Sequence, residues 1–276
     1  DTDSFNKLIE TCGYSKEDFY SSTDFFDASV EEKDKGNYIE SLRLLDKCKE
    51  IGFDDTSYLK SAYYSTYYKS GKYDLALGVL SEMLVDISED DVVWWNKQFL
   101  YTNFELENWS QLTIKCKELI SQYTLDPDAL DNSVNLTFIK KETNFVYQIF
   151  DTYTSSLSKK GEYEKALIIT GKFMKLGKVL ENNDFIKTAY LGNGVYKMES
   201  GDYLGALQDI NEYIKLTEEW SSGYLTRGKI KLRMSDAYSK YACGDFNLAL
   251  EVSQKNENED EEAQQEIQKF IDDNCK

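Results

Sequence analysis

Cysteines and carboxylates are the side chains of this 276-residue chain that could carry chemistry. The chain contains five cysteines and 50 acidic residues but no histidine. The commonest general base and the commonest zinc ligand are therefore both absent. The cysteines form no CxxC pair and are too sparse for a small domain built on disulfides. These residue types point away from an enzyme.

Two of the cysteines could form a disulfide. Cys243 lies near the start of one predicted helix, and Cys275 lies at the end of the terminal one. If these helices are antiparallel neighbours, their sulfur atoms meet and close a loop of about 32 residues, which the chain-entropy model values at about 3.5 kcal/mol. Free thiols are the alternative, because the cysteine total is odd. Cys48 and Cys116 have the spacing of core residues, and we expect both to be small buried side chains.

The acidic residues are numerous but show no catalytic or metal-binding arrangement. Runs such as 89–91 and 259–262 fall in turns or at predicted helix starts, where carboxylates interact favourably with the helix dipole. None has the pattern of a calcium loop, and no phosphate-binding or nucleophile motif is present. We therefore expect no catalytic residue, no metal and no cofactor. An enzyme that uses carboxylates alone, as many glycosidases do, is the remaining catalytic alternative.

The net charge of −18 constrains the partners of the protein. Such a chain is repelled by nucleic acid and by anionic lipid, so a basic or polar partner is favoured and nucleic acid is not expected. No window approaches the roughly 18 apolar residues of a transmembrane segment. The chain begins at Asp1 without Met, which is typical of a processed mature form or of a trimmed sequence. Export to a periplasm or cell surface is slightly favoured over the cytoplasm, and the oligomeric state is left open.

The elements that must position any site are predicted to be helices. With a single proline and helical apolar spacing throughout, the chain is expected to be all-α. A break that ends in an aromatic residue recurs, with about 35 residues as the usual spacing and one interval of 54: Tyr38, Tyr73, Trp109, Tyr163 and Tyr203. Offsets +3, +4, +7, +10 and +11 from the aromatic are small or apolar in nearly every copy, and a sixth copy keeps this register at Ala242. This period fits one antiparallel helix pair per repeat.

The Gly-x-Tyr-x-x-Ala-Leu blocks at this period resemble tetratricopeptide repeats. Tyr190 with Gly194, and Tyr224 with Gly228, are similar to the first helix of that family. Residues 242–275 resemble the terminal repeat and closing helix of many bacterial members. The resemblance implies a right-handed solenoid of antiparallel helix pairs, about six pairs plus a terminal capping helix. No copy carries the family's frequent proline after the second helix.

The 54-residue interval interrupts the repeats and suggests how the chain is organised. We expect an N-terminal stack over 1–126, a connecting segment over 127–160 and a C-terminal stack with its capping helix over 161–276. The connecting segment is either one helix of about 45 Å or two helices that break near Asn144.

The resemblance implies that the first helices line a concave groove that binds peptides or partner proteins. Part of the family grips a carboxylate there with Lys, Arg and Asn, but the matching positions of this chain carry other residue types: Tyr58, Ser61, Ser65, Thr188, Leu191 and Val195. Surplus aromatics that lie off the expected core row, or side by side, are the candidate groove contacts: Tyr58, Tyr64, Tyr68, Trp94 and Trp95. Packing between repeats is the alternative role for these aromatics.

We predict a non-enzymatic protein–protein interaction scaffold that binds a peptide or protein partner in the groove. The alternative is an exported bacterial surface protein that binds a glycan or small ligand through the groove aromatics.

Overall fold

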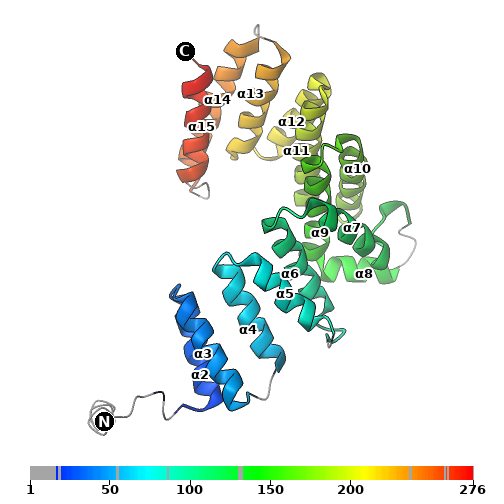
Figure 1. Cartoon of the computed structure of the whole chain (residues 1–276). Helices are drawn as coiled ribbons and strands as arrows, with labels where there is room; N and C mark the ends of the chain where they lie inside the picture. The colour runs from blue at the N-terminus through cyan, green and yellow to red at the C-terminus, as the bar shows by residue number, and fades with distance from the viewer. Residues whose placement is uncertain are drawn as a thin grey trace. The chain divides into compact units, whose positions relative to one another are not determined.

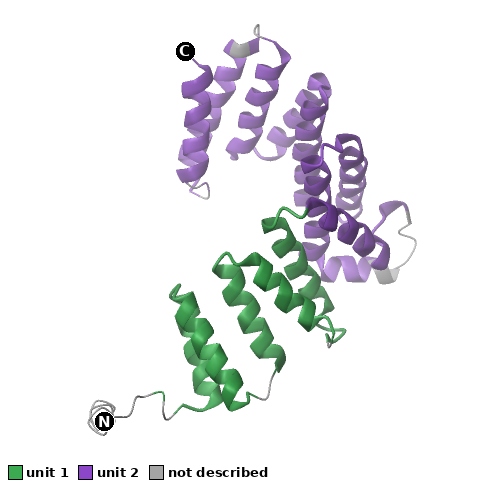
Figure 2. Ribbon diagram, in the orientation of Figure 1, with its two compact units in different colours: residues 1–108 green, residues 109–276 purple. Residues whose placement is uncertain are grey.

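The computed structural model describes residues 17, 20–53, 56–85, 87–129, 133–235, 238–257, 259 and 261–275, apart from the side chains of 129, 133–135 and 239. Across these ranges the regular structure is helical and contains no strand (Figure 1), which confirms the all-α prediction. The chain divides into two compact units, residues 1–108 and residues 109–276 (Figure 2). The sequence-based division instead places its first boundary at residue 126.

The described residues of the first unit form two helix pairs and one further helix. In chain order its helices are α2 (Ser22–Asp34), α3 (Tyr38–Ile51), α4 (Thr56–Lys69), α5 (Tyr73–Met83) and α6 (Val92–Glu105). Helix α2 packs along α3 and α4 packs along α5, while contacts of α3 with α4 and of α5 with α6 connect the layers. Helices α3, α4 and α5 therefore each pack against the helix before and the helix after them.

The second unit contains three helix pairs, a leading helix, an inserted helix and a cap. Its elements are α7 (Trp109–Gln122), the short 3-10 helix η2 (Pro127–Ala129), α8 (Ser133–Lys141), α9 (Thr143–Lys159), α10 (Tyr163–Val179), α11 (Asn183–Ser200), α12 (Tyr203–Leu216), α13 (Ser221–Met234), α14 (Ser239–Lys255) and α15 (Glu261–Asn274). Helices α9–α10, α11–α12 and α13–α14 pair, α7 packs on α9, and α15 packs on α14. The series of first and second helices along the described chain confirms about six pairs followed by a cap.

The repeat register predicted from the sequence is present in every copy. The aromatic residue of each break is the first residue of α3, α5, α7, α10 or α12, and the sixth copy begins at Ser239, the first residue of α14. Counted from those residues, the side chains at +3, +7 and +10 are buried in all six copies, and those at +4 are half-buried. These offsets form one face of a helix. The +11 position departs from the pattern in the first copy, which carries Lys49, and is exposed in the first two copies, at Lys49 and Leu84.

The breaks share a backbone conformation that ends the first helix. Two residues before the aromatic, Gly36, Gly71, Gly161 and Gly201 have φ between +72° and +88°. Glu107 occupies the same place in the third copy with φ +54°. Glycine adopts this left-handed conformation without the steric cost that a side chain carries, so Glu107 is a strained version of the same turn.

The connecting segment forms two helices. Helix α8 ends at Lys141 and α9 begins at Thr143, so the chain breaks at Glu142, just before the expected position near Asn144. The Thr143 hydroxyl donates to the carbonyl of Ile139 at 3.0 Å across this break. Helix α9 is extensively buried, with eight buried residues over its 17 positions.

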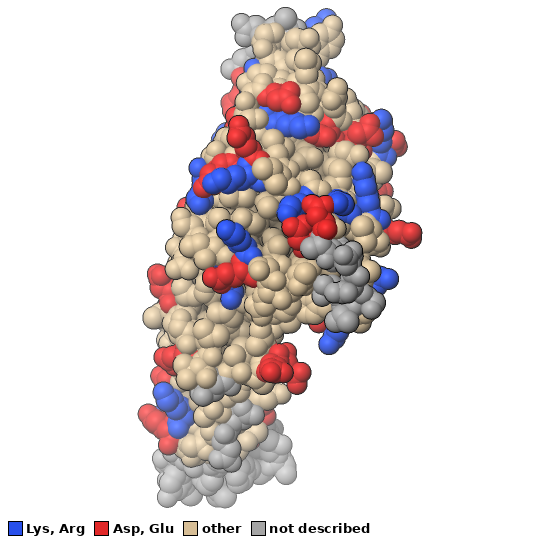
Figure 3. Space-filling view, turned by 90° about the vertical axis from the view of Figure 1, so that its right-hand side faces the viewer, with Lys and Arg blue, Asp and Glu red and all other residues tan. Residues whose placement is uncertain are grey.

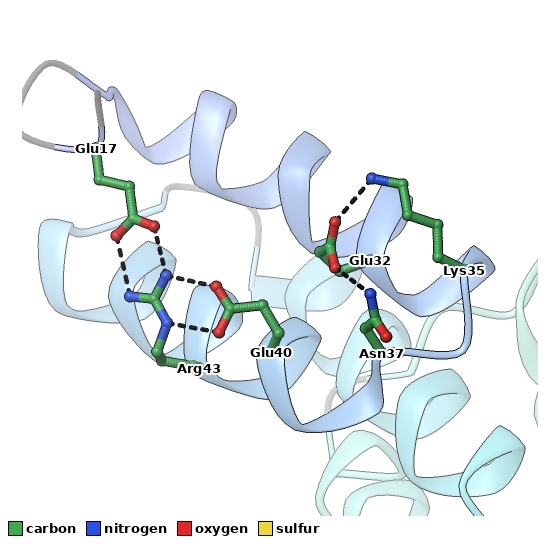
Figure 4. A network of polar contacts seen from close by, with 6 residues as sticks. All are labelled: Glu17, Glu32, Lys35, Asn37, Glu40 and Arg43. Carbon is green, nitrogen blue, oxygen red and sulfur yellow. Dashed lines mark hydrogen bonds and ion pairs between the residues drawn. The ribbon is translucent and has the colours of Figure 1, made fainter. Parts of the chain in front are cut away.

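A polar network holds the residue that precedes α2 against α3 (Figure 4). Arg43 donates through Nη1 and Nη2 to the Glu17 carboxylate at 3.0 and 2.5 Å, and through Nε to Glu40 at 2.9 Å. Glu32 accepts from Lys35 and from the Asn37 amide at 2.8 and 2.7 Å. These pairs are largely exposed, so each contributes little to stability.

The acidic run before the cap has a structural role that its sequence did not suggest. Glu259 accepts from the backbone N–H of Ser221 at 2.6 Å and from its hydroxyl at 2.5 Å. Ser221 is the first residue of α13, so Glu259 caps that helix from the loop between α14 and α15. The Glu259 carboxylate therefore stabilises the start of α13, which lies 38 residues earlier in the chain.

Candidate functional site

Two of the five predicted groove aromatics are core residues. Tyr64 and Trp95 are only 4 % and 5 % exposed, so the prediction that they contact a ligand is wrong. The Trp95 indole N–H donates to the carbonyl of Leu80 at 2.8 Å, and the Tyr64 hydroxyl lies 3.1 Å from that of Thr102. Burial raises the pKa of Tyr64 to about 12. Both side chains pack in the apolar cluster between α4, α5 and α6.

Tyr68 belongs to the same aromatic cluster. Its ring centroid lies 5.9 Å from that of Tyr64 and 5.3 Å from that of Tyr73, the latter in an edge-on contact. The side chain is half-buried, and burial raises its pKa to about 12. Its contacts are those of a packing residue.

Tyr58 and Trp94 line a hollow of the first unit, which we call the α4 hollow. Its volume is about 630 Å³, and its lining residues are Thr56, Ser57, Tyr58, Lys60, Ser61, Met83, Ile87, Ser88, Asp91 and Trp94. Tyr58 is 66 % exposed. Trp94 is half-buried, with its ring edge-on to Tyr64 at 5.9 Å. The structure places these two predicted aromatics on an accessible surface.

A more extended site, which the sequence analysis did not single out, lies along α9 and α11 in the second unit. It consists of two adjoining hollows of about 480 and 280 Å³ that share Thr188 and Leu191. We call them together the α9–α11 groove. Three of its lining residues, Thr188, Leu191 and Val195, stand at the positions that match the family's clamp.

The floor of the α9–α11 groove is aromatic and tightly packed. Tyr147 on α9 contacts Phe173 and Phe185 edge-on, at centroid distances of 5.5 and 5.7 Å. Its hydroxyl lies 2.9 Å from that of Thr188 on α11, which ties the two helices together across the groove. Burial raises the pKa of both Tyr147 and Tyr196. These contacts give the groove a preformed wall.

One carboxylate lines the groove without a partner. Asp151 on α9 borders the smaller hollow, and its carboxylate makes no hydrogen bond or ion pair with any other residue that the structure describes. Burial raises the pKa of this carboxyl above its ordinary value. The cations of the lining interact elsewhere: Lys187 pairs with Asp184 at 3.5 Å, and Lys159 lies over the Trp109 ring at 5.8 Å.

The structure joins Cys243 and Cys275 in a disulfide, with Cα atoms 5.6 Å apart. This bond links α14 to the residue that follows α15, and so attaches the cap to the last helix pair. Cys48 and Cys116 are free and fully buried, as predicted, and burial raises the pKa of both thiols.

Neither metal ligands nor a membrane span are found among the described residues. No three His, Cys, Asp or Glu side chains in these ranges lie together as a metal ion would require. No described helix has the length and apolar character needed to cross a bilayer. On the face drawn in Figure 3, acidic and basic side chains are interspersed, so the acidic excess forms no single patch there.

Comparison with known proteins gives matches in structure alone. No family model and no curated protein matches the chain. Among solved structures, it is similar to a tetratricopeptide repeat protein from Parabacteroides merdae at 18 % identity and a TM-score of 0.43, over 90 % of this chain and 98 % of that one. It is also similar to the yeast Sti1 TPR2AB domain solved in a complex, at 11 % identity and a TM-score of 0.38, over 92 % and 98 % of the two chains. The P58(IPK) TPR domain matches at 14 % identity and a TM-score of 0.36, over 92 % and 67 %.

The helix pairs and the buried positions common to all six copies define the architecture. In all six copies the +3, +7 and +10 side chains of the second helix are buried, and in five of them a left-handed residue ends the first helix. The chain therefore has an all-α, tetratricopeptide-like repeat fold.

Proposed function

We propose that this protein is a non-enzymatic scaffold that binds a peptide or protein segment in the α9–α11 groove. The observation that carries the proposal is the pair of adjoining hollows along two successive first helices. Each hollow has the volume of one or two side chains, so together they suit an extended segment with two anchors. The lining combines apolar floor residues with a few polar groups, as binding sites usually do.

The groove also has the rigidity that recognition of a segment requires. The helices that form it are held by the Tyr147–Thr188 hydrogen bond and by buried phenylalanines, so little order has to be gained on binding. With the chain carrying −18, long-range attraction favours a basic or polar partner and disfavours nucleic acid.

A second candidate function is glycan or small-ligand binding by an exported bacterial surface protein. It now rests on the α4 hollow, where Tyr58 and Trp94 are the two aromatics that a sugar ring could stack on. The Cys243–Cys275 bond favours this setting, because disulfides persist in oxidising compartments.

Selection from a random peptide library displayed on phage tests the first proposal. Ser155→Trp fills the smaller hollow from α9, where Ser155 is a half-buried lining residue. Ile168→Trp is the matched control, because Ile168 on α10 is 62 % exposed and lines neither hollow. Circular dichroism and thermal melts establish that both variants are folded.

We expect peptides that bind the wild type and Ile168→Trp equally and bind Ser155→Trp at least about tenfold more weakly. Enrichment of no peptide, or equal binding to all three proteins, would refute the groove proposal. Binding that survives Ser155→Trp but is lost in Tyr58→Ala would move the site to the α4 hollow.

A further inference from the structure

The unpartnered carboxylate of Asp151 is the feature of the α9–α11 groove that its fold does not explain. Asp151 lies in the middle of α9, so it neither caps a helix nor interacts with a helix N-terminus. Its carboxylate has no hydrogen-bond or ion-pair partner among the described residues, although it is half-buried at the edge of the hollow. A charge in such a place lowers stability unless something neutralises it.

The charged and titratable groups of the groove leave Asp151 uncompensated. On α9 these are Tyr147 and Lys159, on α11 they are Asp184, Lys187 and Tyr196, and on α12 it is Tyr213; α10 contributes only Thr170 and Phe173 to the lining. Lys187 is paired with Asp184, and Lys159 lies over the Trp109 ring. Tyr147 and Tyr196 are uncharged at neutral pH, as tyrosines ordinarily are, and burial moves their pKa further upward.

The surroundings of Asp151 suit the stem and head of a basic side chain. Tyr147 and Ser155 lie one helical turn before and after it, on the same face of α9. Tyr196 and the hydroxyls of Thr154 and Ser155 line the same hollow as Asp151, and a tyrosine ring interacts favourably with a cation near its face. The hollow of about 280 Å³ accommodates a single long side chain.

We propose that Asp151 anchors a lysine or arginine side chain of the segment that binds in the α9–α11 groove. This inference rests on the proposed function and names the chemistry that the groove recognises. A lysine or arginine side chain is complementary in charge to Asp151, because it supplies the positive charge that no described residue of the protein places beside this carboxylate.

Titration of a short peptide into isotope-labelled protein tests the anchor. The probe is the blocked heptapeptide Gly-Gly-Ser-Arg-Ser-Gly-Gly, and its twin carries citrulline, which has the shape of arginine without its charge. The protein variants are Asp151→Asn, which removes the charge with little change in shape, and Asp74→Asn. Asp74 is exposed on α5 in the first unit, so it controls for the change in net charge.

We expect the arginine peptide to shift amide resonances of α9 and α11 in the wild type and in Asp74→Asn. The affinity should fall by about tenfold or more in Asp151→Asn, and by a similar factor for the citrulline twin. Equal binding to wild type and Asp151→Asn, or to both peptides, would overturn the anchor. If library peptides respond to Ser155→Trp but not to Asp151→Asn, the groove function stands and the anchor alone is refuted.

Discussion

Gly194 lies where α11 and α12 approach each other closely, so a substitution there is a sensitive test of the packing between these two helices. A Cβ at this position would lie 2.4 Å from both Cγ1 and Cδ1 of Ile210. Ile210 is fully buried at the +7 position of α12, so a shift of its side chain disturbs the core residues around it. Gly194→Ala therefore forces either the Ile210 side chain or the two helices to move.

Gly171→Ala provides the matched control, because a Cβ at position 171 of α10 would meet no atom within 4 Å. Both substitutions gain about 1 kcal/mol of helix propensity. Overpacking a core of this kind costs about 1–3 kcal/mol, and only Gly194→Ala incurs that cost. The free energy of unfolding should therefore be about 1–3 kcal/mol lower for Gly194→Ala than for Gly171→Ala, and the difference isolates the packing term.

Hydrogen exchange read by mass spectrometry is the appropriate assay, because a chain of two compact units need not unfold in one step. Peptides from α11 and α12 should exchange faster in Gly194→Ala. Adding Ile210→Val, which removes Cδ1, should restore part of the protection. Equal exchange in Gly194→Ala and Gly171→Ala, or no rescue by the second substitution, would refute the close approach of these helices.

Three further perturbations have defined outcomes. Glu107→Gly should raise the melting temperature through a gain of up to about 1 kcal/mol, because Glu107 has φ +54°, whereas Glu107→Ala should not. Non-reducing peptide mapping should recover Cys243 linked to Cys275, and reduction should speed hydrogen exchange in α15, since the chain-entropy model values the crosslink at about 3.5 kcal/mol. Asp151→Asn should raise the melting temperature at pH 7 but not at pH 3. Burial raises the pKa of the Asp151 carboxyl in the folded protein, so the folded protein loses stability as the pH rises from the carboxyl pKa of the unfolded chain through that of the folded protein. A melting temperature that is the same for both proteins at each pH would contradict the burial of that charge.

The repeat register was predictable from the sequence because each second helix buries the same face. One small residue at +3 and larger ones at +7 and +10 recur, so the period, the helix starts and the core positions could be derived from residue types alone. Even the copy that lacks its aromatic begins its helix at the expected residue, Ser239. The pattern of buried positions is irregular only at +11, close to the end of the helix, where Leu84 is 51 % exposed.

The buried face of a first helix was harder to predict, because these helices pack on both sides. A single apolar row on α4 would bury Leu59, Ala62 and Tyr63, yet Tyr63 is half-buried and its neighbour Tyr64 is 4 % exposed. Leu59 and Ala62 pack with α2 and α3, while Tyr64 packs with α5 and α6. Two buried faces about 170° apart, on nearly opposite sides of one short helix, cannot be separated by periodicity.

Asp151 was missed for a different reason, namely that a partnerless charge leaves no local pattern. The signal that could have revealed it is composition: Asp151 is the single carboxylate among the 17 residues of α9. The other residues of that helix are uncharged up to its last one, Lys159, so a carboxylate between Phe150 and Thr152 contradicts the local rule for a buried helix.

Asp151 supports the proposed binding site in the α9–α11 groove more strongly than the aromatic residues do. The buried positions of each second helix are +3, +7 and +10, so packing constrains the residue types there. The exposed rows of the first helices are free to vary. Aromatics on such rows serve packing as readily as binding, as Tyr64 and Trp95 show. A half-buried carboxylate without a partner contributes nothing to packing and lowers stability. A ligand that brings a positive charge is the condition under which such a residue becomes favourable, and the groove beside Asp151 has room for one.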